Sequence, residues 1–301
     1  MSPRPLDLLD LPTLYHYRAE AVSLDSTRFL TRGNPLGAAG FMSYFNPARH
    51  LYTAVSQENG IPLVGGVIQT NGDPFARLVY LAPTSHMTHA GLPALIEHLC
   101  VEAGQWGAFH VLAETEENSD VFPALRKAGF SVYAWQRIWD VSHISSSESL
   151  PGWMHTQSVN LPAVQQLYHQ IVPPLLQPVE STPRHASGMV CADGTRCYVN
   201  ITSGVHGIVL TPLIHPETTD VALRLASLLN DLPNRHGRPV FLCVRSYQAW
   251  LEPAIEDMGG KAAPRQAVMV KHLARLVKDD QVVRAAQPAG VSVQPSRVSR
   301  P

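Results

Sequence analysis

A repeat places the strongest constraint on the fold, because the same order of predicted elements occurs twice along the 301 residues. In each half a helical segment precedes two strands, a third strand, a helix, a buried strand, a short helix and a final strand. Pro83 precedes Gly129 by nearly the same interval as Pro216 precedes Gly259. This shared order and spacing indicate that the chain is a tandem duplication, although the two halves have little sequence identity.

The periodicity of the first half predicts a complete set of elements. They are a helical segment over 11–32, strands over 51–57, 62–70 and 75–81, a helix over 92–104, a strand over 109–113, a helix over 120–128 and a final strand pair over 131–141. Asn59-Gly60 is a strong hairpin signal between the first two strands, and Asn71-Gly72 predicts the next turn.

The second half predicts the same elements in the same order. They are a helix over 161–176, strands over 187–192, 196–202 and 206–214, a helix over 220–232, a strand over 240–244, a short helix over 249–258 and a last strand over 267–273. Gly129 and Gly259 are expected to end equivalent helices in left-handed conformations.

The boundary between the halves is expected in the Ser-rich stretch HISSSESLPG that begins at His143. We therefore predict a first domain over 1–142, a linker over 143–155 and a second domain over 156–275. Residues 276–301 have no helical stripe and are rich in Pro, Gln and Ser, which predicts a disordered tail.

The composition argues against several classes of partner. Charged residues make up 16% of the chain and the formal net charge is −1, so neither nucleic acid nor an anionic membrane is expected as a partner. The N-terminus has no long apolar stretch of a signal peptide, and no apolar run approaches the ~18 residues that span a bilayer. A cytoplasmic location is expected, and the sequence leaves the oligomeric state open.

The four cysteines contain no CxxC pair. Cys100 and Cys243 lie in apolar runs typical of core thiols. Cys191 and Cys197 flank an Asp-Gly turn, so they could face each other across a hairpin. Reduced thiols in a cytosolic protein are expected.

The element order and one local motif resemble the GNAT superfamily of acyl-CoA-dependent acetyltransferases. The motif is NSDVFPALRKAGF, in which Asn118, Ala124-Leu125, Lys127 and Gly129-Phe130 occupy the positions of a family pattern. The resemblance implies an α/β (α+β layered) fold with two tandem domains, each a mixed, mostly antiparallel sheet flanked by helices. An unrelated α/β protein with an amphipathic helix ending in Gly-Phe remains the alternative.

The family binds acyl-CoA through Arg/Gln-x-x-Gly-x-Gly/Ala, where backbone N–H groups at a helix N-terminus hold the pyrophosphate. In this chain His86 stands at the Arg/Gln position, His89 replaces the first glycine and Gly91 fits the last position. Pro93 predicts that the helix starts near Leu92. The resemblance thus implies acetyl-CoA or another acyl-CoA as cosubstrate, held by Leu81, Pro83, His86, Met87, Thr88, His89, Ala90, Gly91 and Asn118. It also implies that this ligand lies between the parallel strands 75–81 and 109–113, which separate so that an open backbone edge pairs with the pantetheine amides. Two ordinary loop histidines are the alternative for His86 and His89.

The second half lacks this motif, because the matching positions 219–224 contain no glycine and Asp220 would repel pyrophosphate. Gln248 falls at the Asn118 position. We therefore expect the second copy to support the first domain or to close over its substrate.

Catalysis by the family requires a general base and often a tyrosine that protonates the leaving thiolate. Leu125 and Ile255 occupy the tyrosine positions and cannot supply a proton. The candidate bases are Glu114 and Glu116 after the predicted strand 109–113 and Asp73 before the predicted strand 75–81, although acids in loops are more often solvated surface. No metal-binding motif is present, and His86-x-x-His89 lacks a third ligand.

Two main hypotheses follow. The leading one is an acyl-CoA-dependent N-acyltransferase that acts on an unknown small-molecule or protein amine, with the first domain working. The alternative is a non-catalytic GNAT-like protein that binds a small molecule or a partner. Gly91 and Asn118 favour retained CoA binding, whereas His89 and Leu125 favour the alternative. A third hypothesis is an interaction protein that uses the groove between the halves.

Overall fold

A computed structural model describes most of the chain. The described residues are 2–37, 49–58, 60–70, 73–144, 152–183, 188–192, 194, 196–233 and 235–273. The predicted tail and residues 145–151 of the predicted linker lie outside them, as do Asn59, Asn71-Gly72 and Asp193 of the predicted turns.

The first half follows the predicted order of elements closely. It contains β1 (Arg4–Pro5), η1 (Leu8–Asp10), α1 (Leu11–His16), η2 (Tyr17–Ala19), β2 (Val22–Ser23), α2 (Ser26–Arg32), β3 (Arg49–Glu58), β4 (Ile61–Thr70), β5 (Phe75–Ala82), η4 (Thr84–His86), α4 (Leu92–Gln105), β6 (His110–Glu116), α5 (Val121–Lys127) and β7 (Ser131–Asp140).

The second half repeats this order. It contains β8 (Trp153–His155), α6 (Leu161–Ile171), β9 (Gly188–Cys191), β10 (Cys197–Ser203), β11 (Ile208–Ile214), α7 (Val221–Asp231), β12 (Val240–Arg245), η5 (Ser246–Leu251), α8 (Glu252–Asp257), β13 (Lys261–Ala262) and β14 (Gln266–His272). Strand β8 lies inside the predicted linker and pairs with β9.

Two sequence predictions about these elements are wrong. Residues 131–141 form one long strand, β7, and not a strand pair. The helical segment predicted over 11–32 is interrupted by β2, because backbone pairing with β5 replaces helical hydrogen bonds at Val22 and Ser23. The Asp25 side chain then caps α2 by accepting a hydrogen bond from the Arg28 N–H at 3.0 Å.

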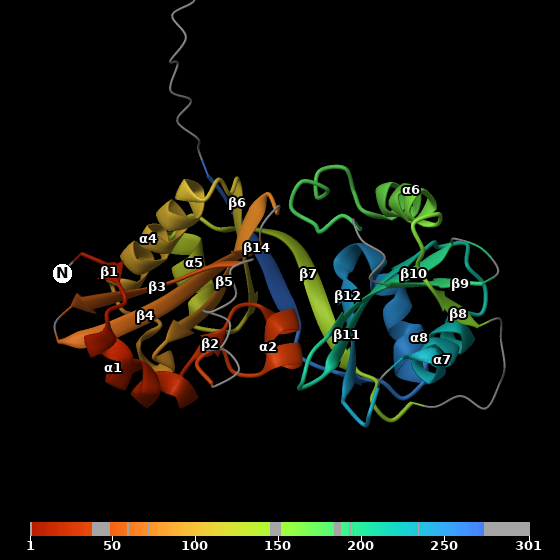
Figure 1. The fold of residues 1–301 in the computed structure, drawn as a ribbon, viewed down its shortest axis with the longest axis horizontal. Helices are drawn as coiled ribbons and strands as arrows, with labels where there is room; N and C mark the ends of the chain where they lie inside the picture. The colour runs from red at the N-terminus through yellow and green to blue at the C-terminus, as the bar shows by residue number, and fades with distance from the viewer. Residues whose placement is uncertain are drawn as a thin grey trace, which may run out of the picture.

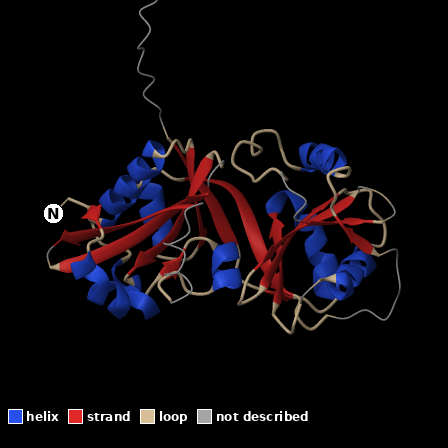
Figure 2. Cartoon of the chain, viewed as in Figure 1, coloured by secondary structure: helices blue, strands red, loops and turns tan. Residues whose placement is uncertain are grey.

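The described strands form one 14-stranded sheet that runs through both halves (Figures 1 and 2). The parallel pairs among them are β5–β6 and β11–β12, and the other pairs are antiparallel. This arrangement, with helices packed against the sheet, confirms the predicted mixed, mostly antiparallel architecture (Figure 2).

The two halves exchange their last strands at the centre of the sheet, where the order is β6-β14-β7-β12. Strand β14 pairs with β6 of the first half along its whole length, from Gln266↔Glu116 to His272↔His110. Strand β7 pairs in turn with β12 of the second half. Figure 1 shows both strands side by side between the halves. The domain boundary at 143–155 stays a prediction. Strand β7, before this boundary, pairs with a strand of the second half, and β14, after it, pairs with a strand of the first half.

Each half has an apolar core on the sheet, and the exchanged strand of the other half contributes to it, with Met269 of β14 in the first core and Trp139 of β7 in the second. In the first half the stripe Leu92, Leu95, Ile96 and Leu99 of α4 is fully buried, as its helical spacing predicts. In the second half Leu225, Leu228 and Leu229 of α7 pack against Trp153 and Leu242. Packing in the first core fixes the positions of β5 and β6, the strands that carry the candidate site.

Gly129 and Gly259 end α5 and α8 with φ of +85° and +93°, which confirms their predicted left-handed conformation. Gly129→Ala is therefore expected to lower the free energy of unfolding by about 1 kcal/mol, measured by urea denaturation. Gly104→Ala is the matched control, because Gly104 lies inside α4 and the nearest heavy atom to an added Cβ is 3.6 Å away. Alanine there is expected to be neutral or stabilising. Equal losses in both variants would contradict the assignment.

Candidate functional site

The predicted acyl-CoA site lies where β5 and β6 separate. These parallel strands pair only from Phe75↔His110 to Arg77↔Leu112. Beyond Arg77, β5 continues to Ala82 beside β4, while β6 continues to Glu116 beside β14. The two strands thus diverge at the place where the resemblance implies that an open β5 edge binds the pantetheine amides.

A segment of the chain itself occupies this edge. Strand β2 pairs with β5 through Val22↔Leu81 and Ser23↔Tyr80. The Leu24 N–H donates to the Val79 carbonyl at 2.9 Å, and the Leu24 carbonyl accepts from the Glu114 N–H at 2.8 Å. The Leu24 side chain is 1% exposed within the core of the first half. The segment therefore bridges β5 and β6 and uses backbone groups that a pantetheine would need.

The predicted phosphate-binding residues form one continuous turn from the end of β5 to the start of α4. Within it Met87 and Gly91 are buried and Thr88 and Ala90 are exposed, and α4 begins at Leu92 as predicted. Asn118 lies apart, exposed in the turn after β6.

Several N–H groups of this turn already have partners inside it. The N–H groups of His86, His89 and Leu92 donate to the carbonyls of Pro83, His86 and His89, respectively. The Gly91 N–H donates to His89 Nδ1, and each of the four distances is 3.1 Å. The His89 ring thus accepts a hydrogen bond from the N–H of Gly91, the glycine that matches the last position of the family motif. These groups could bind a pyrophosphate only after the turn rearranged.

A carboxylate lies beside the same turn. The Thr84 N–H and hydroxyl both donate to the Glu20 carbonyl, at 2.8 and 2.7 Å. The Ser85 hydroxyl lies 3.5 Å from Glu20 Oε2 and 2.9 Å from His86 Nδ1. Glu20 thus brings negative charge close to the position predicted for phosphate, and this charge would oppose an anionic ligand.

The candidate bases do not converge on this opening. Glu114 is buried and ion-paired with arginines, and Glu116 is exposed at the end of β6. Asp73 lies before β5 and lines a cavity of about 200 Å³ together with Glu180 and Thr182. Leu125, at the family's tyrosine position, is fully buried in α5.

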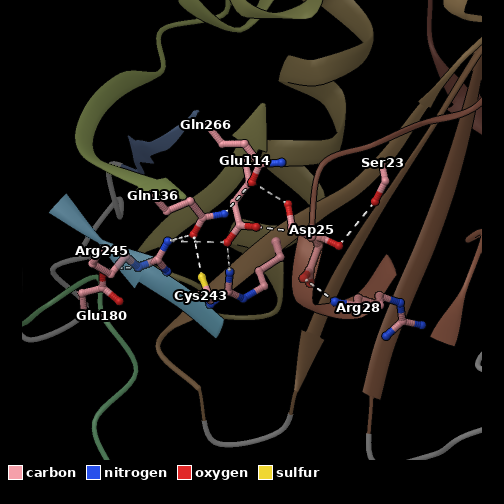
Figure 3. Close-up of polar contacts among 11 residues, drawn as sticks. Ser23, Asp25, Arg28, Glu114, Gln136, Glu180, Cys243, Arg245 and Gln266 are labelled. Carbon is pink, nitrogen blue, oxygen red and sulfur yellow. Dashed lines mark hydrogen bonds and ion pairs between the residues drawn. The ribbon is translucent and has the colours of Figure 1, made fainter. Parts of the chain in front are cut away.

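A buried polar cluster lies between the halves and was missed by sequence reasoning (Figure 3). Its charged members are Asp25, Arg77, Glu114, Glu180 and Arg245. The ion-pair distances to Glu114 Oε1 are 3.6 Å from Arg77 and 3.9 Å from Arg245. Arg245 Nε also lies 3.0 Å from Glu180 Oε1. A lone charge in an otherwise apolar strand, such as Arg77 in FARLVYL, was the available sequence signal.

Two glutamines and a serine connect the charges across the exchanged strands. Ser26 donates its N–H to Glu114 Oε2 and its hydroxyl to Gln266 Oε1, each at 2.9 Å. Gln136 donates to the same Gln266 oxygen at 2.8 Å and accepts a hydrogen bond from Arg245. Residues of β2–α2, β6, β7, β12 and β14 therefore share one network.

The carboxylates of the cluster are shifted in opposite directions. Burial raises the pKa of Asp25, and the Arg77 guanidinium offsets this only in part. Burial also opposes the charged form of Glu114, but Arg245 and Arg77 outweigh it and lower the pKa of Glu114. The two arginines therefore favour the ionised form of Glu114 and pair with it inside the cluster.

The second-half residues at the motif positions have structural roles of their own. Asp220, the N-cap residue of α7, has a φ of +56°, and its side chain makes no capping hydrogen bond. Gln248, at the Asn118 position, is buried and donates to the Ile214 carbonyl at 2.9 Å. This hydrogen bond connects η5 to β11.

Two other types of site were sought within the described part of the chain. It contains no group of three or more His, Cys, Asp or Glu residues placed to hold a metal ion. No helix within those ranges is long and apolar enough to cross a membrane.

Comparison with solved structures identifies the fold class. No family model and no curated protein sequence matches the chain. A tandem GNAT protein from the clavulanic acid biosynthesis pathway aligns over 90% of this chain and 98% of its own, with a TM-score of 0.51 and 14% identity. A GCN5-related N-acetyltransferase from Sphaerobacter thermophilus aligns over 90% and 95%, with a TM-score of 0.54 and 13% identity.

These comparisons confirm the predicted class: the chain has the tandem GNAT fold over about 90% of its length. At such identities the likeness shows the fold and does not transfer an activity.

Proposed function

We propose that this protein uses the tandem GNAT fold without catalysing acyl transfer, and that it binds a small molecule or a partner protein. The observation that carries the proposal is the pairing of β2 with β5, which fills the edge that would bind an acyl-CoA. The internal hydrogen bonds of the 83–92 turn and the Glu20 carboxylate support it.

The residues available for chemistry also favour this function. Acyl transfer needs a base near the acyl carbon. Glu114 faces arginines, Glu116 is exposed and Leu125 has no proton to give. None of these candidates therefore supplies an acid–base pair at the opening, and the Asp220 carboxylate would repel phosphate in the second half.

An acyl-CoA-dependent N-acyltransferase is the second candidate, and one observation favours it. Strands β5 and β6 still diverge at Arg77, and the only paired residues of β2 are Val22 and Ser23. Displacement of this short strand would expose the β5 edge to a cosubstrate such as acetyl-CoA.

The test is the melting temperature of the full-length protein with and without acetyl-CoA. A ligand at about 100 times its Kd adds about 2.7 kcal/mol to the native state, which would raise the Tm by several degrees. We expect no shift. A reproducible rise would contradict the proposal, and hydrogen exchange that protects 78–82 would then assign the ligand to the β5 edge.

A variant separates the two candidates further. Leu24→Ala removes the side chain that anchors the β2 segment in the core. If acetyl-CoA stabilises this variant and not the wild type, the first half retains a cosubstrate site beneath β2. Leu30→Ala, in the neighbouring helix α2, is the control, because Leu30 packs against Val209 and Cys243 of the second half.

A further inference from the structure

Two cysteines of the second half face each other across neighbouring strands. Cys191 ends β9 and Cys197 begins β10, and the pairing Tyr198↔Val190 places Cys197 directly opposite Cys191. Both are buried, and their thiols lie within hydrogen-bonding distance of each other. The hairpin expected from sequence is therefore formed with both thiols on one face.

The backbone geometry of such a pair suits a disulfide. Residues directly opposite in an antiparallel pair have Cα atoms about 4.5–5.5 Å apart, inside the range of about 4.4–6.8 Å found across disulfides. Closing the bond requires the two sulfur atoms to approach each other and needs no change of strand register.

A guanidinium group lies against one of the two thiols. Arg224 Nη1 is 3.2 Å from Cys191 Sγ, and Arg224 belongs to the first turn of α7. A nearby cation and a helix N-terminus both favour the thiolate, which is the nucleophilic form. Cys197 lies 3.7 Å from the Thr218 hydroxyl. Its hydrogen bond to Cys191 and its burial raise the pKa of Cys197. The guanidinium contact therefore singles out Cys191 as the nucleophile.

The other two cysteines have a different environment. Burial raises the pKa of Cys100 to about 12 and that of Cys243 to about 12. Cys243 donates to the Gln136 side chain and lies opposite Ile138 in the strand pairing. Cys100 lies in the buried stripe of α4. Neither arrangement offers a second thiol.

We propose that Cys191 and Cys197 form a redox-active dithiol that reacts with a hydroperoxide to give a disulfide. The Cys191 thiolate attacks the peroxide, an S–O bond forms, the O–O bond breaks and the leaving oxygen takes up a proton as water or alcohol. The Cys197 sulfur then attacks the sulfenic acid, the S–S bond forms and water leaves. Two thiols are oxidised and one peroxide is reduced.

The position of the dithiol connects it to the loop before α7. Arg224 donates from Nε to the Thr219 carbonyl at 2.9 Å, and its own carbonyl accepts from Trp153 Nε1 at 2.8 Å. Oxidation removes the thiolate partner of Arg224. The loop at 215–220, which leads into the positions that match the first-half phosphate-binding motif, therefore responds to the oxidation state.

The experiment treats the native full-length protein with hydrogen peroxide, then blocks free thiols and measures the intact mass. We expect a product lighter by two hydrogen atoms, with peptide mapping that links Cys191 to Cys197. Cys191→Ser and Cys197→Ser should each abolish this product, whereas Cys100→Ser and Cys243→Ser should retain it. A link between other cysteines, or a disulfide formed only after denaturation, would overturn the proposal.

The role of Arg224 has its own readout. Arg224→Met should slow disulfide formation by about tenfold, because the Cys191 thiolate loses its neighbouring cation, and Arg224→Lys should recover part of the rate. An unchanged rate in Arg224→Met, with the native circular dichroism spectrum retained, would contradict activation by the guanidinium.

Discussion

A chain that ends at Pro264, and so lacks β14, is expected to lose the native fold. Strand β14 buries Val268, Met269 and Val270 and pairs with both β6 and β7. Burial of each such side chain contributes about 1.5–3 kcal/mol, so together with the lost strand pairing the deficit approaches the 5–15 kcal/mol that usually separates folded from unfolded domains.

The measurement is the thermal transition by circular dichroism, together with limited proteolysis. The control chain ends at Leu273 and keeps every paired residue of β14. We expect the wild-type transition in the control and no cooperative transition in the shorter chain. A native melting curve for the chain without β14 would show that the first half completes its sheet without the exchanged strand.

The second large effect is expected from Arg245→Ala, which should lower the free energy of unfolding by about 3–5 kcal/mol. Arg245 forms ion pairs with both Glu180 and Glu114, so the substitution removes a cation from each of these carboxylates. Urea denaturation at pH 7 measures the loss. Arg137→Ala is the matched control, because Arg137 in β7 forms a partly exposed ion pair with Glu252 and should cost less than about 1 kcal/mol.

The same variant tests the electrostatic origin of the effect through pH. The folded pKa of Glu114 lies below its unfolded value, so its contribution to stability is present above the unfolded pKa and is lost as pH falls through the folded pKa. The stability difference between wild type and Arg245→Ala should therefore shrink as the pH falls below about 4. A difference that stays constant down to pH 3 would assign the loss to packing.

The sequence predicted most elements because local patterns determine them. The α4 stripe, the glycine caps and the buried strands each depend on periodicity or on a backbone conformation that glycine allows. Strand β14 was also found, but its partners were not, because the alternation of Gln266–His272 is the same whichever strand lies beside it. A pattern within one strand does not specify a neighbour from another domain.

The candidate site was harder to predict for a related reason. The segment 11–32 was predicted as helical, and only the separation of β5 from β6 created an edge for Val22 and Ser23 to pair with. The motif at 86–91 lies in the turn that leads into α4. One of the internal hydrogen bonds of that turn depends on the His89 side chain, which stands at a glycine position of the family pattern.

The exchanged strands also determine when this protein can begin to fold. On the ribosome, β6 and β7 emerge long before β14, so the first half cannot complete its sheet until almost the whole chain has been synthesised. Its two strand edges stay open during that time, and open edges invite pairing with other chains. We therefore expect folding to be largely post-translational and to depend on chaperones at high expression. The two halves are also expected to be inherited together, because a gene that kept only one of them would encode an incomplete sheet.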